Sequence, residues 1–96
     1  MGLLGGIKMN IHRLKIEKEC FEEVKEGRKT FEIVRNDRGY KVGDFVILTK
    51  VDDEGFLTRD VLVGTITYLL KGRPDYGLEC GYCVFSFKIN KVNGGC

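Results

Sequence analysis

The sequence contains one proline, one histidine and no tryptophan among its 96 residues. It also lacks any run approaching the roughly 20 apolar residues that a membrane-spanning helix requires, so we expect no membrane partner. It shows no internal repeats, linkers or low-complexity blocks, and a chain of this length is expected to form one domain. With 43% hydrophobic and 31% charged residues, the composition is typical of a globular protein with a modest single core.

Neither sign of charge dominates the composition. There are 16 Lys plus Arg residues against 14 Asp plus Glu, which gives a formal net charge of +2. This balance does not by itself predict a nucleic-acid-binding protein, and any basic patch has to arise from local clustering.

The first residues show no export signal. The apolar stretch 1–6 is very short and has neither a charged n-region nor a cleavage site, so we expect a cytoplasmic protein. Met9 is an alternative native start to Met1. We assign residues 1–10 to an N-terminal extension or cloning remnant, 11–92 to the domain and 93–96 to a flexible tail.

The four cysteines do not have the spacing of a complete metal site. Cys80 and Cys83 are spaced like a zinc knuckle, but a structural zinc site needs four ligands. Cys83 also alternates with Phe85 and Phe87, as a small buried hydrophobe in a strand would. A lone histidine is more typical of a core or edge residue than of a ligand or a catalytic base. We expect no metal and no other cofactor, because the remaining candidate ligands are isolated in the sequence: His12, Cys20 and Cys96.

Hydrophobic periodicity predicts five strands and one helix. The strands are expected at residues 11–16, 30–35, 45–51, 56–70 and 82–92, and the helix at 17–26. Gly27 is placed to end the helix in a left-handed turn, and Gly64 to form a bulge or bend in the longest strand. Residues 52–55 are expected to form a hairpin turn, and residues 71–78, which include Pro74, a loop.

These elements predict a fold of the α+β class. It would be a small, mostly antiparallel β-barrel of about five strands, capped or plugged by one helix near the N-terminus. In strand 30–35, alternation is expected to direct Phe31 and Ile33 to the core and Glu32 and Val34 to the opposite face.

Residues 27–44 carry most of the side chains that could bind a ligand or take part in catalysis. In a desolvated pocket, Lys29 and Glu32 could act in general acid–base catalysis, although such a pair is more often a structural salt bridge. We expect Lys15 beside the strand that carries Glu32. Tyr40 is placed to stack on a base. Further basic side chains predict either phosphate binding or a solvated basic turn: Arg28, Arg35, Arg38 and Lys41.

Several motifs, in this order, resemble a known family. Gly27-x-Lys29-x-x-Glu32 resembles the core motif of the ASCH domains, which belong to the PUA-like superfamily of small β-barrels. The wider set resembles the DUF3850 family, a small domain of unknown function common in phages and Firmicutes. The resemblance covers roughly residues 11–90, and its matching stretches lie at 12–15, 27–33, 36–38, 42–44 and 77–82.

The resemblance implies a PUA-like barrel with a cleft beside the helix. The superfamily is associated with RNA binding and, in some members, with modified nucleosides. We therefore expect RNA or a nucleotide-like small ligand as the partner. The residues expected to contact it are Lys15, Lys29, Glu32, Arg35, Asn36, Asp37, Arg38 and Tyr40.

Two alternatives follow from the same resemblance. One ASCH branch is an amidohydrolase that removes acyl groups from N4-acylated cytidine with a lysine, a threonine and a glutamate. The lysine matches Lys29 and the threonine position matches Glu32, whereas the third residue falls in a helical segment that this chain lacks. If the protein is an enzyme, Lys29 and Glu32 are its catalytic residues. The other alternative is a phage-type interaction module that binds a host protein.

The chain departs from the ASCH motif after the glutamate. The motif places an arginine two residues later, on the same strand face, where this chain has Val34. Arg35 follows it, and alternation sends that side chain to the other face unless a bulge intervenes. Arg38 or Lys15 would then have to supply the positive charge.

Overall fold

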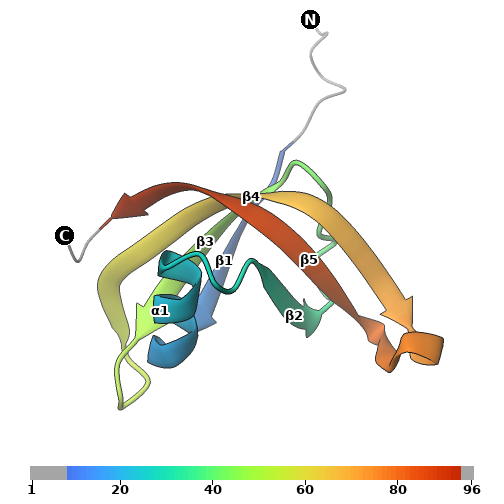
Figure 1. The fold of residues 1–96 in the computed structure, drawn as a ribbon, viewed down its shortest axis with the longest axis horizontal. Helices are drawn as coiled ribbons and strands as arrows, with labels where there is room; N and C mark the ends of the chain where they lie inside the picture. Colours follow the sequence, from blue (N-terminus) through green and yellow to red (C-terminus); the bar gives the residue numbers. More distant parts are fainter. Residues whose placement is uncertain (1–8, 94–96) are drawn as a thin grey trace, which may run out of the picture.

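The computed structural model describes residues 9–93 of the chain (Figure 1). Each predicted strand and the predicted helix is present, in the predicted order. The elements are β1 (Ile11–Ile16), α1 (Lys18–Lys25), β2 (Phe31–Arg35), β3 (Phe45–Val51), β4 (Leu57–Arg73), the 3-10 helix η2 (Pro74–Tyr76) and β5 (Leu78–Asn93).

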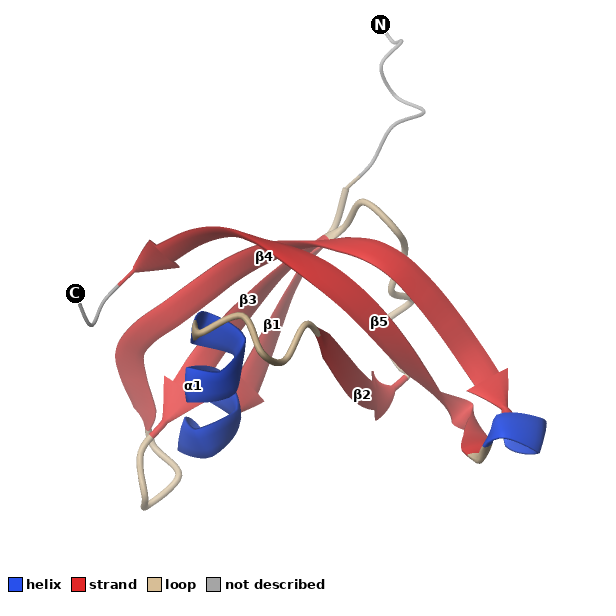
Figure 2. Ribbon diagram, viewed as in Figure 1, coloured by secondary structure: helices blue, strands red, loops and turns tan. Residues whose placement is uncertain are grey.

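The five strands form one mixed sheet in the order β1-β3-β4-β5-β2. β1 and β3 are parallel, and the other three neighbouring pairs are antiparallel. β1 and β2 lie at opposite edges and do not pair, so the sheet is a curled half-barrel rather than the barrel that we expected (Figure 2). α1 lies under the curl, where its apolar side chains, instead of further strand pairing, cover the core.

The core fills the space between α1 and the inner face of the sheet. Phe21 and Val24, three residues apart on α1, are each only 2% exposed. The predicted inward set of β5 is confirmed, and Cys83 belongs to it. The sheet contributes alternating residues of β3, β4 and β5: Val46, Leu48, Leu62, Ile66, Cys83, Phe85 and Phe87.

β4 and β5 form a long curved hairpin with three register shifts. One shift lies at Gly64, as predicted, and a Cβ atom there would lie 3.0 Å from the backbone oxygen of Lys88. The predicted loop at 71–78 is wrong, because both strands extend into this range and only η2 and one glycine separate them. Gly72 permits the close approach, since a Cβ atom on it would lie 2.8 Å from the Cα atom of Cys80.

The predicted orientation of β2 is also wrong. Glu32 lies opposite Phe85 in the antiparallel pair with β5. Directly opposed residues share a face of the sheet, and Phe85 is buried in the core, so Glu32 faces inward. Phe31 and Ile33 face outward and are 42% and 57% exposed. Alternation separates the two sets of side chains, but the register with β5 decides which set faces the core.

The ends of the described range adjoin the sheet. Asn10, which we assigned to the N-terminal extension, bonds through its backbone to Asp44 and Phe45 and so belongs to the folded unit. Asn93, assigned to the tail, is the last residue of β5. The rest of the predicted extension and tail lies outside the described residues. No helix in the described part of the chain is long and apolar enough to cross a membrane.

Candidate functional site

The candidate site begins where α1 ends. The N–H of Gly27, whose φ is +82°, donates to the carbonyl oxygen of Val24 at 3.0 Å, and the N–H of Arg28 donates to that of Glu23 at 2.9 Å. These two bonds form a Schellman motif, so Gly27 ends the helix as predicted. The turn carries the chain toward β2, with Lys29 on the connecting segment.

Lys29 and Glu32 are in contact. Nζ of Lys29 donates to Oε2 of Glu32 at 2.9 Å, and the two side chains are 21% and 12% exposed. The same Nζ lies 5.6 Å from the centroid of the Phe31 ring. An ammonium carries three N–H donors and a carboxylate accepts several bonds, so this contact saturates neither group. A half-buried pair with spare hydrogen-bonding capacity can bind a polar ligand or exchange a proton with one.

Arg35 lies on the outer face of the sheet. The register of β2 with β5 runs without a shift, so Arg35 and Glu32 face opposite sides, as predicted. The guanidinium carbon of Arg35 lies 5.7 Å from the centroid of the Tyr82 ring, on the neighbouring strand. The positive charge that the ASCH motif places beside the glutamate is therefore on the other face of β2.

Lys15 lies far along the sheet from the Lys29–Glu32 pair. It is exposed on the outer face of β1, beside a hollow that Thr49 and Leu57 also line. The prediction that Lys15 adjoins β2 is wrong, because β1 pairs with β3 at the opposite edge of the sheet.

The turn after β2 is tied to other strands. Nη1 of Arg38 donates to the carbonyl oxygen of Arg13 on β1 at 2.6 Å, and Oδ1 of Asp37 lies 4.0 Å from Nε of Arg38. The N–H of Asn36 donates to the carbonyl oxygen of Gly81 at 2.8 Å. The side-chain Oδ1 of Asn36 is buried without a hydrogen-bond partner among the described residues, an uncommon state for an acceptor.

The basic residues near the turn do not gather into one phosphate-binding cluster. Arg28 pairs with Glu23 at 2.6 Å, on exposed helix surface. Lys29 pairs with Glu32, while Arg35 faces outward. Of the groups that we expected to converge, the structure brings together Lys29 and Glu32.

Tyr40 lies inside the core. It is 2% exposed, and its ring centroid lies 4.5 Å from that of His12 and 5.1 Å from that of Phe85. The expectation that Tyr40 stacks on a base is not supported, because the neighbouring rings occupy the space around it.

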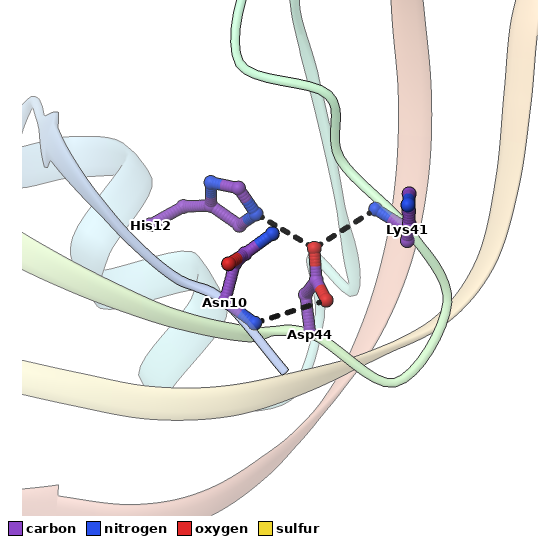
Figure 3. Close-up of polar contacts among 4 residues, drawn as sticks. All are labelled: Asn10, His12, Lys41 and Asp44. Carbon is purple, nitrogen blue, oxygen red and sulfur yellow. Dashed lines mark hydrogen bonds and ion pairs between the residues drawn. The ribbon is translucent and has the colours of Figure 1, made fainter. Parts of the chain in front are cut away.

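A buried acid–base pair links β1 to the start of β3 (Figure 3). Nε2 of His12 and Oδ2 of Asp44 are 2.8 Å apart, and the residues are 5% and 2% exposed. The backbone N–H of Asn10 donates to Oδ1 of Asp44 at 3.3 Å, and that of Lys41 donates to Oδ2 at 3.1 Å. The prediction of a core or edge histidine is confirmed. Its partner was missed, since the sequence between these positions, which are 32 residues apart, contains no signal for this pairing.

The surroundings of Asp44 favour its charged form. Burial alone would raise the pKa of this carboxyl. The hydrogen bond from His12 and those from the N–H groups of Asn10 and Lys41 outweigh burial, so the pKa of Asp44 lies below its ordinary value. A pair this inaccessible and this fully bonded holds the fold together and leaves no room for a substrate.

The described residues contain no group of three or more His, Cys, Asp or Glu side chains placed to bind a metal ion. The two knuckle cysteines differ in their surroundings, because Cys83 is buried and Cys80 is exposed. Burial raises the pKa of the Cys83 thiol.

Comparison with protein families assigns the chain to one family. A family model described as a domain of unknown function, DUF3850, matches residues 11–87. The chain belongs to the DUF3850 family. The matched range includes both Lys29 and Glu32. No curated protein matches the chain. Membership of DUF3850 assigns no activity to these residues.

Proposed function

We propose that this DUF3850 protein is an ASCH-type domain of the PUA-like superfamily that binds RNA or a nucleotide-like ligand through Lys29 and Glu32. The observation that carries the proposal is the half-buried contact of 2.9 Å between these side chains, at the end of α1 and on the inner side of β2. The pair occupies the motif through which the chain resembles the ASCH domains. The predicted cytoplasmic location remains part of this proposal.

The chemistry of the pair suits a nucleotide. The ammonium of Lys29 can donate to a phosphate or to a base carbonyl, and the carboxylate of Glu32 can accept from an exocyclic amine or a ribose hydroxyl. Bonds between charged groups and a ligand are stronger than those between neutral groups, so two of them can position a small ligand.

The edge position of β2 adds backbone groups to the site. The carbonyl of Thr30 and the N–H of Asn36 bond to β5. Along an antiparallel strand the bonding direction alternates, so the N–H and carbonyl groups of Phe31, Ile33 and Arg35 point to the free edge of the sheet. A ligand held at Glu32 can therefore also bond to the strand itself.

Binding to a panel of RNA oligonucleotides and free nucleotides tests the proposal. Lys29→Ala is expected to weaken binding about tenfold or more, because it removes a charged donor. Arg28→Ala is the matched control, since it removes an adjacent positive charge that pairs with Glu23 on the exposed helix surface. Affinity for RNA should fall with added salt. Equal losses in the two variants, or no binding to any member of the panel, would contradict the proposal.

A second function is favoured by the same contact. A lysine and a carboxylate 2.9 Å apart are close enough for proton transfer, so the pair could serve an amidohydrolase that acts on N4-acylated cytidine. Lys29 would be the proton shuttle or nucleophile, and Glu32 its partner. This is the weaker candidate for two reasons. Glu32 stands where the ASCH amidohydrolase has a threonine, and the chain has no residue that matches the third catalytic position.

Turnover distinguishes the enzyme from the binding protein. The protein is incubated with N4-acetylcytidine, and cytidine and acetate are followed by chromatography. An enzyme should form both products in the wild type and lose them in Lys29→Ala, while Arg28→Ala keeps them. If a high protein concentration yields no product, the amidohydrolase is excluded for this substrate and binding remains.

A further inference from the structure

The outer face of the sheet carries an apolar patch that is open to solvent. Directly opposed residues of β2, β5 and β4 line up in rows across this face. Phe31, Ile33 and Tyr68 are 42%, 57% and 63% exposed. α1 lies on the other side, under the curl (Figure 2). We call these residues the outer patch: Phe31, Ile33, Tyr68, Leu70, Tyr82 and Val84.

Two positive charges at the ends of the outer patch have no acidic partner. Arg35 lies at the β2 end, with its guanidinium carbon 5.7 Å from the centroid of the Tyr82 ring. Lys88 lies beyond the patch on β5, two residues after the outward-facing Ser86 and opposite Thr65. Neither Arg35 nor Lys88 forms an ion pair with any residue in the described part of the chain. The charge of each is therefore free to attract an anionic ligand.

The spacing of these charges indicates the kind of ligand. Arg35 lies opposite Tyr82, and Lys88 is six residues further along β5, so the two positions are about 20 Å apart along the strand. The rings and aliphatic side chains of the outer patch, together with Ser86, lie in the interval. Separated cations with flat apolar groups between them complement a polyanion that carries flat rings.

We propose that the outer patch binds single-stranded nucleic acid, with bases stacked on its aromatic side chains and phosphates held by Arg35 and Lys88. Stacking of this kind accepts any base, because every base has a π-face. A duplex keeps its bases stacked inside, so they cannot reach the rings. The inference rests on the proposed function only for its ligand class, since the outer patch and Glu32 lie on opposite faces of β2.

One acidic residue borders the outer patch. Glu79 lines a hollow together with Ile33, Leu78 and Tyr82. Its negatively charged carboxylate would repel a phosphate bound at this end of the patch. Glu79→Gln is therefore expected to tighten binding about twofold, in the range measured for exposed charge interactions.

Fluorescence anisotropy with the full chain and a fluorescein-labelled, ten-nucleotide single-stranded RNA tests the inference, with the matching duplex as competitor. Tyr68→Ala removes one stacking ring and should weaken binding about tenfold. Phe56→Ala is the matched control, because it removes a 69% exposed ring from the turn between β3 and β4, outside the outer patch. Arg35→Gln should reduce the slope of log affinity against log salt by about 0.7.

The outcomes separate this inference from the proposed function. Loss of affinity in Tyr68→Ala, no loss in Phe56→Ala and a preference for the single strand support the outer patch. Binding that Lys29→Ala abolishes and Tyr68→Ala leaves unchanged overturns the outer patch and keeps the proposed function. No RNA binding by the wild type overturns the inference, and it leaves the proposed function only if a free nucleotide binds and Lys29→Ala weakens that binding. A homodimer that Ile33→Glu disrupts, with RNA affinity unchanged, overturns the inference in favour of a second copy of the chain.

Discussion

Two acid–base pairs in this protein have nearly equal lengths and different surroundings. His12 and Asp44 are 2.8 Å apart, with side chains 5% and 3% exposed. Lys29 and Glu32 are 2.9 Å apart, with side chains 21% and 12% exposed. Distance alone therefore does not distinguish them, and the difference lies in burial.

The pairs also differ in how many bonds hold them. Asp44 accepts two backbone N–H bonds besides the contact with His12, and one of these comes from the turn before β3. The carboxylate of Glu32 bonds to Lys29 and to no other described residue. The first pair is fixed from several directions and stabilises the fold. The second has spare donors and acceptors near solvent, which is what an exchangeable ligand requires.

The largest effect is expected when the buried pair is broken. Asp44→Ala leaves the buried His12 ring and two part-buried backbone N–H groups without this acceptor, so the free energy of unfolding should fall by about 3–5 kcal/mol. Chemical denaturation measures it. Asp75→Ala, which removes an exposed carboxylate paired with Arg73, is the control. A loss under about 1 kcal/mol in Asp44→Ala would show that the buried pair does not stabilise the fold.

The pH dependence of stability should report the same pair. The pKa of Asp44 is lowered in the folded state, so its stabilising contribution is present above the unfolded value of about 3.9 and is lost as the pH falls through the folded value. The stability difference between the wild type and Asp44→Asn should therefore shrink as the pH falls below about 5. Denaturant titrations at several pH values measure it, and a constant difference would argue against a lowered pKa.

The half-buried pair should contribute less to stability than to binding. Lys29→Met and Glu32→Gln are each expected to lower the free energy of unfolding by about 1 kcal/mol or less, because solvent still reaches both groups. Ligand affinity should fall in both variants. Denaturation and binding measured on the same samples check this. If stability falls as far as in Asp44→Ala, the Lys29–Glu32 pair is structural and the contrast between the pairs disappears.

The smallest effect is expected at an exposed pair. Arg28 and Glu23 are 2.6 Å apart, with side chains 62% and 48% exposed. Water and salt screen such a contact, so Arg28→Ala should not change the denaturation midpoint measurably. A clear loss would mean that the Schellman turn after α1 depends on this side chain.

Sequence reasoning located the candidate site but not its surroundings. The expectation that Lys29 and Glu32 lie near each other is confirmed by their contact of 2.9 Å. The same reasoning placed Lys15 beside them and Tyr40 within reach of a base. Both placements depended on strand order and packing, which a single sequence without long-range information does not contain. His12 was correctly predicted to be a core or edge residue, but Asp44 was not recognised as its partner.

The local structure follows from the sequence by itself. The helix with Gly27 at its end, the alternation in β5, the turn after β3 and the bulge at Gly64 depend on neighbours along the chain, and all were predicted. Backbone conformation and side-chain alternation are local properties, so a short stretch of sequence specifies them.

Only the tertiary structure decided which face of β2 points inward, that β1 pairs in parallel with β3, and that β1 and β2 remain apart at the edges of a half-barrel. Each of these depends on pairing between strands distant in sequence. A shift of one residue in register exchanges the two faces of a strand at no cost in local geometry. The contacts with β5 and the core select one arrangement, and they place Glu32 inside and the exposed rings of Phe31 and Tyr68 outside.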